Sequence, residues 1–359
     1  DNVRALVVTK DGKHLISAGD DAVIKVWKTS DGQQVARMEG HEECIFSLAL
    51  SPDGKNLAYL TSEKQDYAIT ALKIYDFETG KKTKLKGSAS TRMSWSPDGE
   101  ELVFSRNKDG FDDLYIYNVA TDKERRISAK LRSKDPSFSP DGERIVFVHN
   151  EDGTNNLGLI DRDGTDLVYL TNNNDATQYS APRFSPDGEW LLFSVFRGED
   201  RDIAMMRSDS PPRPDFNKSS PGIRKMMSKM MAKKGEEDEE GEVEVMDVFP
   251  DSVAFAHPDS SGFRALLASS ADERDPAWLP DGSGFLFASD QGGIFNIYRY
   301  HMENGEVEQL TNVVGGAFVP TVSVDDEVVY SSYHSNNYSL YRFKLGEFER
   351  DAYFESVAM

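Results

Sequence analysis

Short apolar runs recur along the chain with the spacing of β-strands. The segments 114–117, 296–300 and 339–343 alternate in the way expected of half-buried strands. The segments 101–104 and 144–147 carry continuous apolar runs that end in an aromatic residue. Residues that favour tight turns, mainly Gly, Pro, Asp and Ser, separate these runs. This pattern predicts an all-β protein.

One phrase, Ser-Pro-Asp-Gly or a near copy, precedes many of these runs. Successive copies are 42 to 46 residues apart, with a single longer step of 94 residues. The copies begin at Thr9, Ser51, Ser96, Ser139, Ser185, Leu279 and Ser323. Pro fixes φ at the second position and Asp-Gly closes a tight turn, so the phrase predicts a hairpin.

The register inside the repeat is constant as well. Counting six residues on from the Asp of five phrases always reaches an aromatic residue, namely Tyr59, Phe104, Phe147, Phe193 and Phe287. A period of roughly 40 to 50 residues made of short strands is typical of a β-propeller, in which each repeat is one four-stranded blade. We therefore expect a single propeller rather than two domains.

The count predicts seven antiparallel blades that start near residues 3, 44, 91, 135, 181, 275 and 318, with 347–357 as the last outer strand. The long step is interpreted as an insertion at 209–250 in blade five rather than as an eighth blade, and 262–268 then resume the outer strand. An amphipathic helix is expected at about 222–234, followed by an acidic run at 235–244. The apolar stripe of this helix consists of Ile223, Met226, Met227, Met230 and Met231. It could serve as a partner site or lid, or pack on its own propeller.

Composition narrows the function classes. The chain has 359 residues and a net charge of −21, which argues against nucleic-acid binding through a general phosphate-neutralising surface. The acidic surface could attract a basic partner or simply be solvated. A single cysteine, Cys44, excludes an internal disulfide and a multi-cysteine metal site. No apolar stretch approaches the length of a membrane span, and the absence of a leader fits a cytosolic chain, a processed chain or a fragment.

The first two repeats contain two short motifs: Val26-Trp27 in the first repeat and Gly40-His41 at the start of the second. Over about residues 1–85 the chain resembles WD repeats, although Lys28 replaces the usual Asp. In that family an Asp six residues before the Trp, a Ser or Thr, and a His form a hydrogen-bonded brace between strands. The matching residues are Ser17, Asp21 and Trp27, and the His is missing.

From about residue 88 to 345 the repeats carry a different set of motifs. The segments 136–142, 182–188 and 276–282 share the form Pro-x-aromatic followed by the turn phrase, and Leu-Thr-Asn closes the repeats at 170–172 and 310–312. These motifs resemble TolB-like propellers. The resemblance implies a fold found both in periplasmic translocation proteins and in the gating propellers of tricorn-like and prolyl-oligopeptidase-like proteases. The N-terminal α/β domain of TolB is absent from this sequence.

No catalytic motif stands out in the sequence. There is no G-x-S-x-G elbow, P-loop or Cys-x-x-Cys, and the segment 41–45 begins like a zinc helix but lacks its second His. The segment 161–166 resembles the start of a calcium loop, but Asn172 stands where the bidentate Glu is needed. We therefore predict no catalytic residue, no metal site and no cofactor.

A propeller offers instead a face and a channel mouth. Repeat alignment predicts that cationic and aromatic residues gather at one rim: Arg92, Lys134, Tyr179, Arg274 and Phe318, with Tyr333 and His334 from a loop between strands. Such residues suit a carboxylate-bearing peptide or protein segment. The alternative is that they are scattered rim residues without a shared ligand.

The leading hypothesis is a non-enzymatic interaction scaffold, a monomeric propeller within a hetero-complex. It would present one face to a protein or peptide partner and bind no nucleic acid. By resemblance, the expected setting is a bacterial envelope complex in the periplasm or another extracytoplasmic compartment, with the cytoplasm as the alternative. The second hypothesis is a gating propeller of a larger protease.

Overall fold

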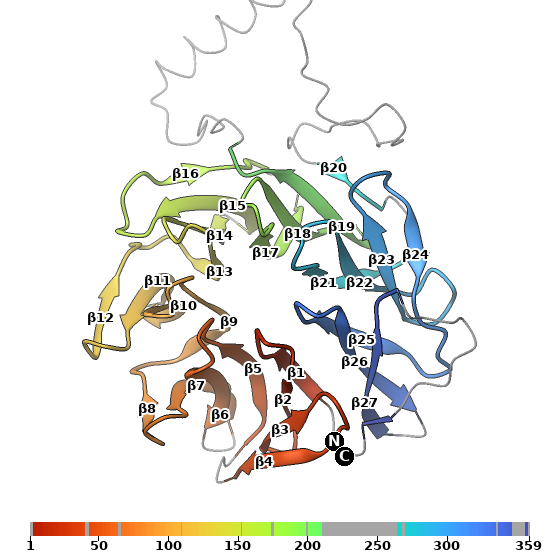
Figure 1. Ribbon diagram of the computed structural model, residues 1–359. Coiled ribbons are helices and arrows are strands. Elements are labelled where there is room, and N and C mark those ends of the chain that lie inside the picture. Colours follow the sequence, from red (N-terminus) through yellow and green to blue (C-terminus); the bar gives the residue numbers. More distant parts are fainter. Residues whose placement is uncertain are drawn as a thin grey trace, which may run out of the picture.

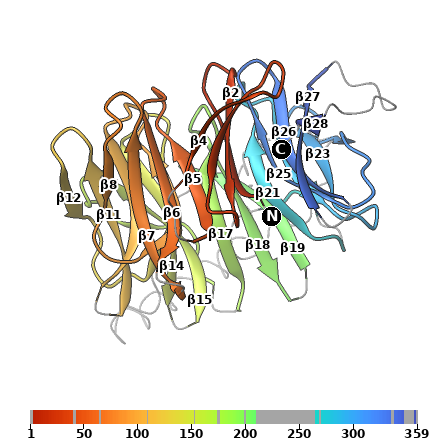
Figure 2. The same cartoon turned by 90° about the horizontal axis from the view of Figure 1, so that it is seen from below.

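The computed structural model describes residues 3–39, 43–63, 66–108, 110–151, 153–173, 176–198, 200–209, 264–267, 270–334, 337–346 and 356–357. Their secondary structure consists of β-strands, which form seven antiparallel sheets of four strands each. The sheets stand as blades around a common centre (Figure 1), and the ring is seen from the side in Figure 2. The predicted seven-bladed propeller is confirmed. The predicted insertion helix and acidic run lie outside the described residues.

In each blade we call the strands A to D from the centre outward. Blades one and two contain β1 (Val3–Val8), β2 (His14–Gly19), β3 (Ile24–Lys28), β4 (Gln34–Met38) and β5 (Ile45–Leu50), β6 (Asn56–Glu63), β7 (Asp66–Asp76), β8 (Lys82–Lys84). Blades three and four contain β9 (Ala89–Trp95), β10 (Glu101–Lys108), β11 (Phe111–Asn118), β12 (Lys123–Arg126) and β13 (Ser133–Phe138), β14 (Arg144–Glu151), β15 (Thr154–Asp161), β16 (Val168–Tyr169). Blade five contains β17 (Gln178–Phe184), β18 (Trp190–Arg197), β19 (Asp200–Arg207) and β20 (Arg264–Ala265). Blades six and seven contain β21 (Glu273–Trp278), β22 (Gly284–Ser289), β23 (Asn296–His301), β24 (Val307–Gln309) and β25 (Ala317–Val322), β26 (Glu327–His334), β27 (Asn337–Lys344), β28 (Ser356–Val357).

The turn phrase links strands A and B, as its composition predicts. In blade four the hydroxyl of Ser139 donates to the carboxylate of Asp141 at 2.5 Å, and the amide of Glu143 donates to the same oxygen at 3.0 Å. Gly142 has a φ of 77°, a conformation that favours glycine. The same Ser–Asp bond is present at Ser51–Asp53, Ser96–Asp98 and Ser185–Asp187. The phrase therefore supplies its own hydrogen-bond partners.

We expect Asp141→Ala to destabilise the protein by about 1 kcal/mol at neutral pH, because two hydrogen bonds to the carboxylate are lost. The hydroxyl of Ser139, and then the amide of Glu143, lower the pKa of Asp141 below the ordinary value of 3.8. A carboxylate whose pKa is lowered by folding stabilises the protein above its unfolded pKa, and this contribution is lost as the pH falls through the folded pKa. Urea unfolding of both proteins should therefore show a difference that shrinks below pH 3.8. A pH-independent difference would contradict this role.

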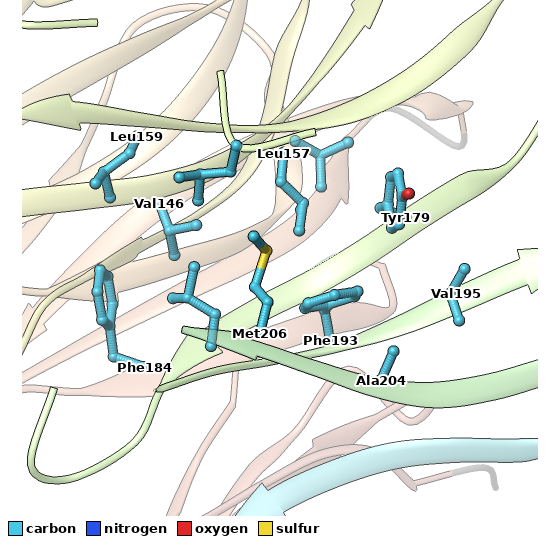
Figure 3. Packing of buried hydrophobic residues seen from close by; sticks show 12 residues of the cluster. Val146, Leu157, Leu159, Tyr179, Phe184, Phe193, Val195, Ala204 and Met206 are labelled. Carbon is cyan, nitrogen blue, oxygen red and sulfur yellow. The ribbon is translucent and has the colours of Figure 1, made fainter. Parts of the chain in front are cut away.

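The hydrophobic core lies between neighbouring blades rather than within one. The described residues form seven buried clusters, and each cluster joins side chains from two adjacent blades. Figure 3 shows the cluster between blades four and five, where Val146 and Leu157 face Phe184, Phe193 and Met206. The five aromatic residues predicted from the repeat register are all at most 1% exposed. One blade cannot bury its own faces, so each blade depends on its neighbours for its core.

The Leu-Thr-Asn closings have a defined structural role. In blade four the hydroxyl of Thr171 accepts a hydrogen bond from the amide of Leu157 at 2.8 Å and donates one to the side-chain oxygen of Asn156 at 3.0 Å. That oxygen also accepts the amide of Asn173 at 2.7 Å. Blade six repeats the arrangement with Asn296, Thr311 and Val313. The motif thus fastens the chain leaving the outer strand to the start of strand C.

Among the described strands, no sheet is shared between the first and last blades. Every blade is a contiguous run of four strands, and blade seven contains β25 to β28. The ring is closed by side chains: Leu15 and Trp27 of blade one pack with Val329 and Leu340 of blade seven. The guanidinium of Arg342 also donates to the carbonyl of Ser30 at 2.9 Å. Closure therefore depends on packing across this interface.

Candidate functional site

The inner strands line the centre of the ring. In each blade the regular pairing of strand A with strand B is interrupted at a similar distance from the A–B turn. In all seven blades the pairing of strands A and B shifts register once. In four blades the shift contains a left-handed residue followed by proline: Asp135, Ala181, Asp275 and Val319, with φ of 53°, 55°, 55° and 51°. Proline lacks an N–H group, so it leaves no donor unpaired at a bulge. Three of these prolines belong to the Pro-x-aromatic motif, whereas Pro320 of blade seven is followed by Thr-Val.

A cavity of about 310 Å³ lies at this level of the channel. Residues from six of the seven inner strands line it, so it belongs to the hub of the ring. Arg4, Arg92 and Arg183 reach it from β1, β9 and β17, and Asp275 reaches it from β21. We call this space the hub cavity. Its lining is cationic although the chain as a whole is strongly acidic.

The three arginines of the hub cavity differ in their partners. Arg4 forms an ion pair with Asp20, and its guanidinium lies 5.5 Å from the ring centroid of Phe46. Arg183 donates to the carbonyl of Pro182 at 3.0 Å and forms no ion pair among the described residues, although the negative charge of Asp135 acts on it. Burial, and then the positive charge of Arg92, lower the pKa of the Arg183 guanidinium to about 10. Arg92 itself has no hydrogen bond or ion pair within the described part of the chain.

A second group of residues lies where the loops between strands B and C meet the loops that enter strand A. We call this end of the ring the B–C face, and the opposite end, which carries the turn phrases, the A–B face. Four rings form a continuous aromatic row across blades six and seven: Phe295, Phe318, Tyr338 and Tyr333. Successive ring centroids are 5.2, 6.5 and 5.0 Å apart. The guanidinium of Arg274 lies 4.2 Å from the centroid of Phe295 and extends the row.

Exposed aliphatic residues come from the loops beside the aromatic row. Val314, in the loop that leads into β25, is 80% exposed, and Ile294, in the loop before β23, is 38% exposed. A half-buried aromatic row flanked by exposed aliphatic side chains and one cation has the composition of a protein-binding surface. The aromatic row is therefore the second candidate site.

The structure separates the predicted rim residues. Arg92 lines the hub cavity, and Lys134 lies half-buried on β13 opposite Val148. Tyr179 is 1% exposed and packs edge-on against Phe193 at 5.6 Å, so its ring is not available at the rim and that placement is corrected. Arg274, Phe318 and Tyr333 come together in the aromatic row. His334 ends β26, and its side chain is outside the described part.

Sequence reasoning missed Arg4 and Arg183 of the hub cavity, and Phe295 and Tyr338 of the aromatic row. Arg183 stands directly after the bulge proline, so its position in the Pro-x-aromatic idiom was available as a signal. Phe295 lies in the B–C loop of blade six, which the repeat alignment did not consider. Tyr338 lies at the start of β27, just after the B–C loop of blade seven.

The brace suggested by the WD resemblance is only partly formed. The indole N–H of Trp27 donates to the hydroxyl of Ser17 at 2.8 Å in a buried setting. Asp21 instead forms an ion pair with Lys25 at 2.7 Å and accepts the amide of Val23. The side chain of Asp21 thus stabilises the turn that contains it and, among the described residues, forms no part of a brace between strands.

In the part of the chain that the structure describes, no group of three or more His, Cys, Asp or Glu side chains could hold a metal ion. Among the same residues, no helix has the length and apolar character required to cross a membrane.

The closed ring and its hub define the molecule as a seven-bladed β-propeller with a cavity at its centre. The family model of the TolB beta propeller domain matches residues 22–213, and that of the WD domain, G-beta repeat, matches residues 1–28. The chain belongs to the TolB beta propeller domain family.

Among curated proteins, coronin-7 of Bos taurus is 32% identical over 104 residues, which are 27% of this chain and 10% of coronin-7. The chain thus spans about a tenth of that relative. A solved prolyl endopeptidase superimposes with a TM-score of 0.66 at 11% identity, covering 99% of this chain and 49% of the other. The tricorn protease does so with a TM-score of 0.59 at 16% identity, covering 99% and 35%. These structural similarities concern the fold alone.

Proposed function

We propose that this chain is a non-enzymatic interaction module that presents its B–C face to a protein or peptide partner. It acts as a single propeller within a hetero-complex and does not bind nucleic acid, in keeping with its net charge of −21. The TolB-like repeats favour a bacterial envelope complex in an extracytoplasmic compartment. The observation that carries the proposal is the aromatic row with Arg274 at its end.

The chemistry of the row supports this role. Tyr and Arg are enriched among the residues that contribute most to protein–protein binding, and aromatic side chains are enriched in interface cores. Phe318 and Tyr333 are half-buried against their neighbours, so they lose little conformational freedom when a partner covers them. Val314 and Ile294 would add apolar area at the edge of the contact.

The test compares partner capture by the wild type and by the double variant Phe318→Ala/Tyr333→Ala. Affinity-tagged chains are incubated with extracts of native membranes, and the captured proteins are identified and titrated. Loss of two central rings should weaken binding by about 2 kcal/mol or more, which is about 30-fold in Kd. Phe77→Ala is the matched control, because Phe77 is 39% exposed and follows β7 on the A–B face.

Thermal unfolding of each variant shows whether the ring remains folded. A folded double variant that captures its partner as well as the wild type does would contradict the proposal. So would a Phe77→Ala chain that loses the partner to the same extent.

A second candidate function is a gating propeller of a larger protease. It is favoured by the superposition on a prolyl endopeptidase and on the tricorn protease, each of which is two to three times as long as the aligned region. The sequence of the full gene product distinguishes the two. A hydrolase core encoded beyond Met359 would favour the gating role.

A further inference from the structure

The hub cavity holds more positive charge than its own residues neutralise. Asp275 is the only acidic residue in its lining, and it forms no ion pair among the described residues. Arg4 is paired with Asp20, but Arg92 and Arg183 have no carboxylate within ion-pair distance in the described part of the chain. The lining therefore presents two guanidinium groups and one carboxylate that are available to a ligand.

Holding two unpaired cations close together at the hub is unfavourable, since each repels the other and water is partly excluded. Arg92 and Arg183 line the same cavity; burial, and then the charge of Arg92, lower the pKa of Arg183, whereas the charge of Asp135 raises it. Binding an anion between them relieves the repulsion, and guanidinium–carboxylate hydrogen bonds are among the strong ones in proteins. The arrangement is suited to a ligand more than to folding.

The positions of these groups are set by rigid backbone. Asp275 occupies the left-handed position of its bulge and is followed by Pro276, while Arg183 follows the bulge proline Pro182. Both inner strands are held by their neighbours in four-stranded sheets. Because the donors and the acceptor stand on different blades, the closed ring itself pre-organises them.

We propose that the hub cavity binds a small zwitterionic carboxylate ligand, with Arg92 and Arg183 holding the carboxylate and Asp275 receiving the ammonium group. A volume of about 310 Å³ lies at the lower end of ligand-site sizes, which fits a small molecule or one charged chain end. The site uses different residues from the aromatic row, so it is independent of the proposed protein-binding face.

Isothermal titration calorimetry of the full chain tests this with two probes. Glutamate carries carboxylates and an ammonium group, whereas succinate carries carboxylates only. Glutamate should bind saturably to the wild type and more tightly than succinate. Arg92→Gln and Arg183→Gln should each weaken glutamate binding by about tenfold to a hundredfold. Asp275→Asn should weaken glutamate binding but not succinate binding, which should strengthen because the repulsion between Asp275 and the succinate carboxylates is removed.

Arg132→Gln is the matched control. Arg132 is an exposed arginine that precedes β13 and lies 5.6 Å from the ring of Phe111, away from the cavity lining. Its variant should bind glutamate as the wild type does. Absence of saturable glutamate binding to the folded wild type would overturn the proposal, and so would equal weakening by Arg132→Gln. A wild type that prefers succinate would overturn the assignment of Asp275.

Thermal unfolding separates a ligand site from a structural cluster. Because burial disfavours the charge of Arg183 and Arg183 forms no ion pair among the described residues, Arg183→Gln should unfold at the same temperature as the ligand-free wild type or higher. Glutamate should raise the Tm of the wild type but not that of the variant. A marked fall in the Tm of ligand-free Arg183→Gln would assign Arg183 to folding and contradict the proposal.

Discussion

Phe193→Ala should destabilise the propeller by about 3 to 5 kcal/mol, the cost of removing a large buried ring from a packed core. Phe193 is 0% exposed and lies in the cluster shared by blades four and five (Figure 3), where Tyr179 meets it edge-on. The cavity left behind borders both blades, so the variant weakens an interface rather than one sheet. Chemical denaturation followed by tryptophan fluorescence measures the loss.

The matched control for this variant lies on the same strand. Phe196 also belongs to β18, but it is 39% exposed, so Phe196→Ala should change the free energy of unfolding far less. Equal effects of the two substitutions would show that the inter-blade cluster does not carry the stability of the ring.

The repeat was predictable because its turn is stabilised by residues that are close together in the sequence. A Ser, an Asp and a Gly at fixed spacing form their own hydrogen bonds, as Ser139 and Asp141 do, and thus make a turn in any blade. The aromatic residue six positions on falls at the same place in strand B each time, so Phe104, Phe147 and Phe193 are all buried. Period and register, together with the interpretation of the long step as an insertion, predict seven blades.

The site was less predictable because the inner strands are bulged. Side chains alternate between the two faces of a strand, and one extra residue reverses the alternation beyond it. Tyr179 precedes the shift between Ser180 and Arg183 and packs into the core, whereas Arg183 follows it and lines the hub cavity. Repeat alignment treats the strand as regular, so it placed the tyrosine at the rim and passed over the arginine.

The aromatic row was partly predictable from the sequence. Arg274, Phe318 and Tyr333 were predicted for one rim, and the structure brings them into one row through Phe295 and Tyr338. Contacts between loops of adjacent blades depend on how the blades are rotated about the hub. The sequence period does not contain that information.

Two exposed valines of blade seven permit a direct comparison of the two faces. Val314 is 80% exposed in the loop that leads into β25, beside the aromatic row, and Val324 is 52% exposed in the turn between β25 and β26 on the A–B face. Replacing either one by a photoreactive phenylalanine analogue leaves the core untouched, because both side chains point into solvent. Any difference in cross-linking therefore reports which face meets a partner.

Photo-cross-linking in native cells at these two positions is the most direct measurement of protein recognition through the B–C face. We expect a chain labelled at position 314 to form a discrete covalent adduct with another protein, and this adduct should disappear when Phe318→Ala/Tyr333→Ala is added. The chain labelled at position 324 should form none. Adducts of equal yield from both positions, or a discrete adduct from position 324 alone, would contradict the account.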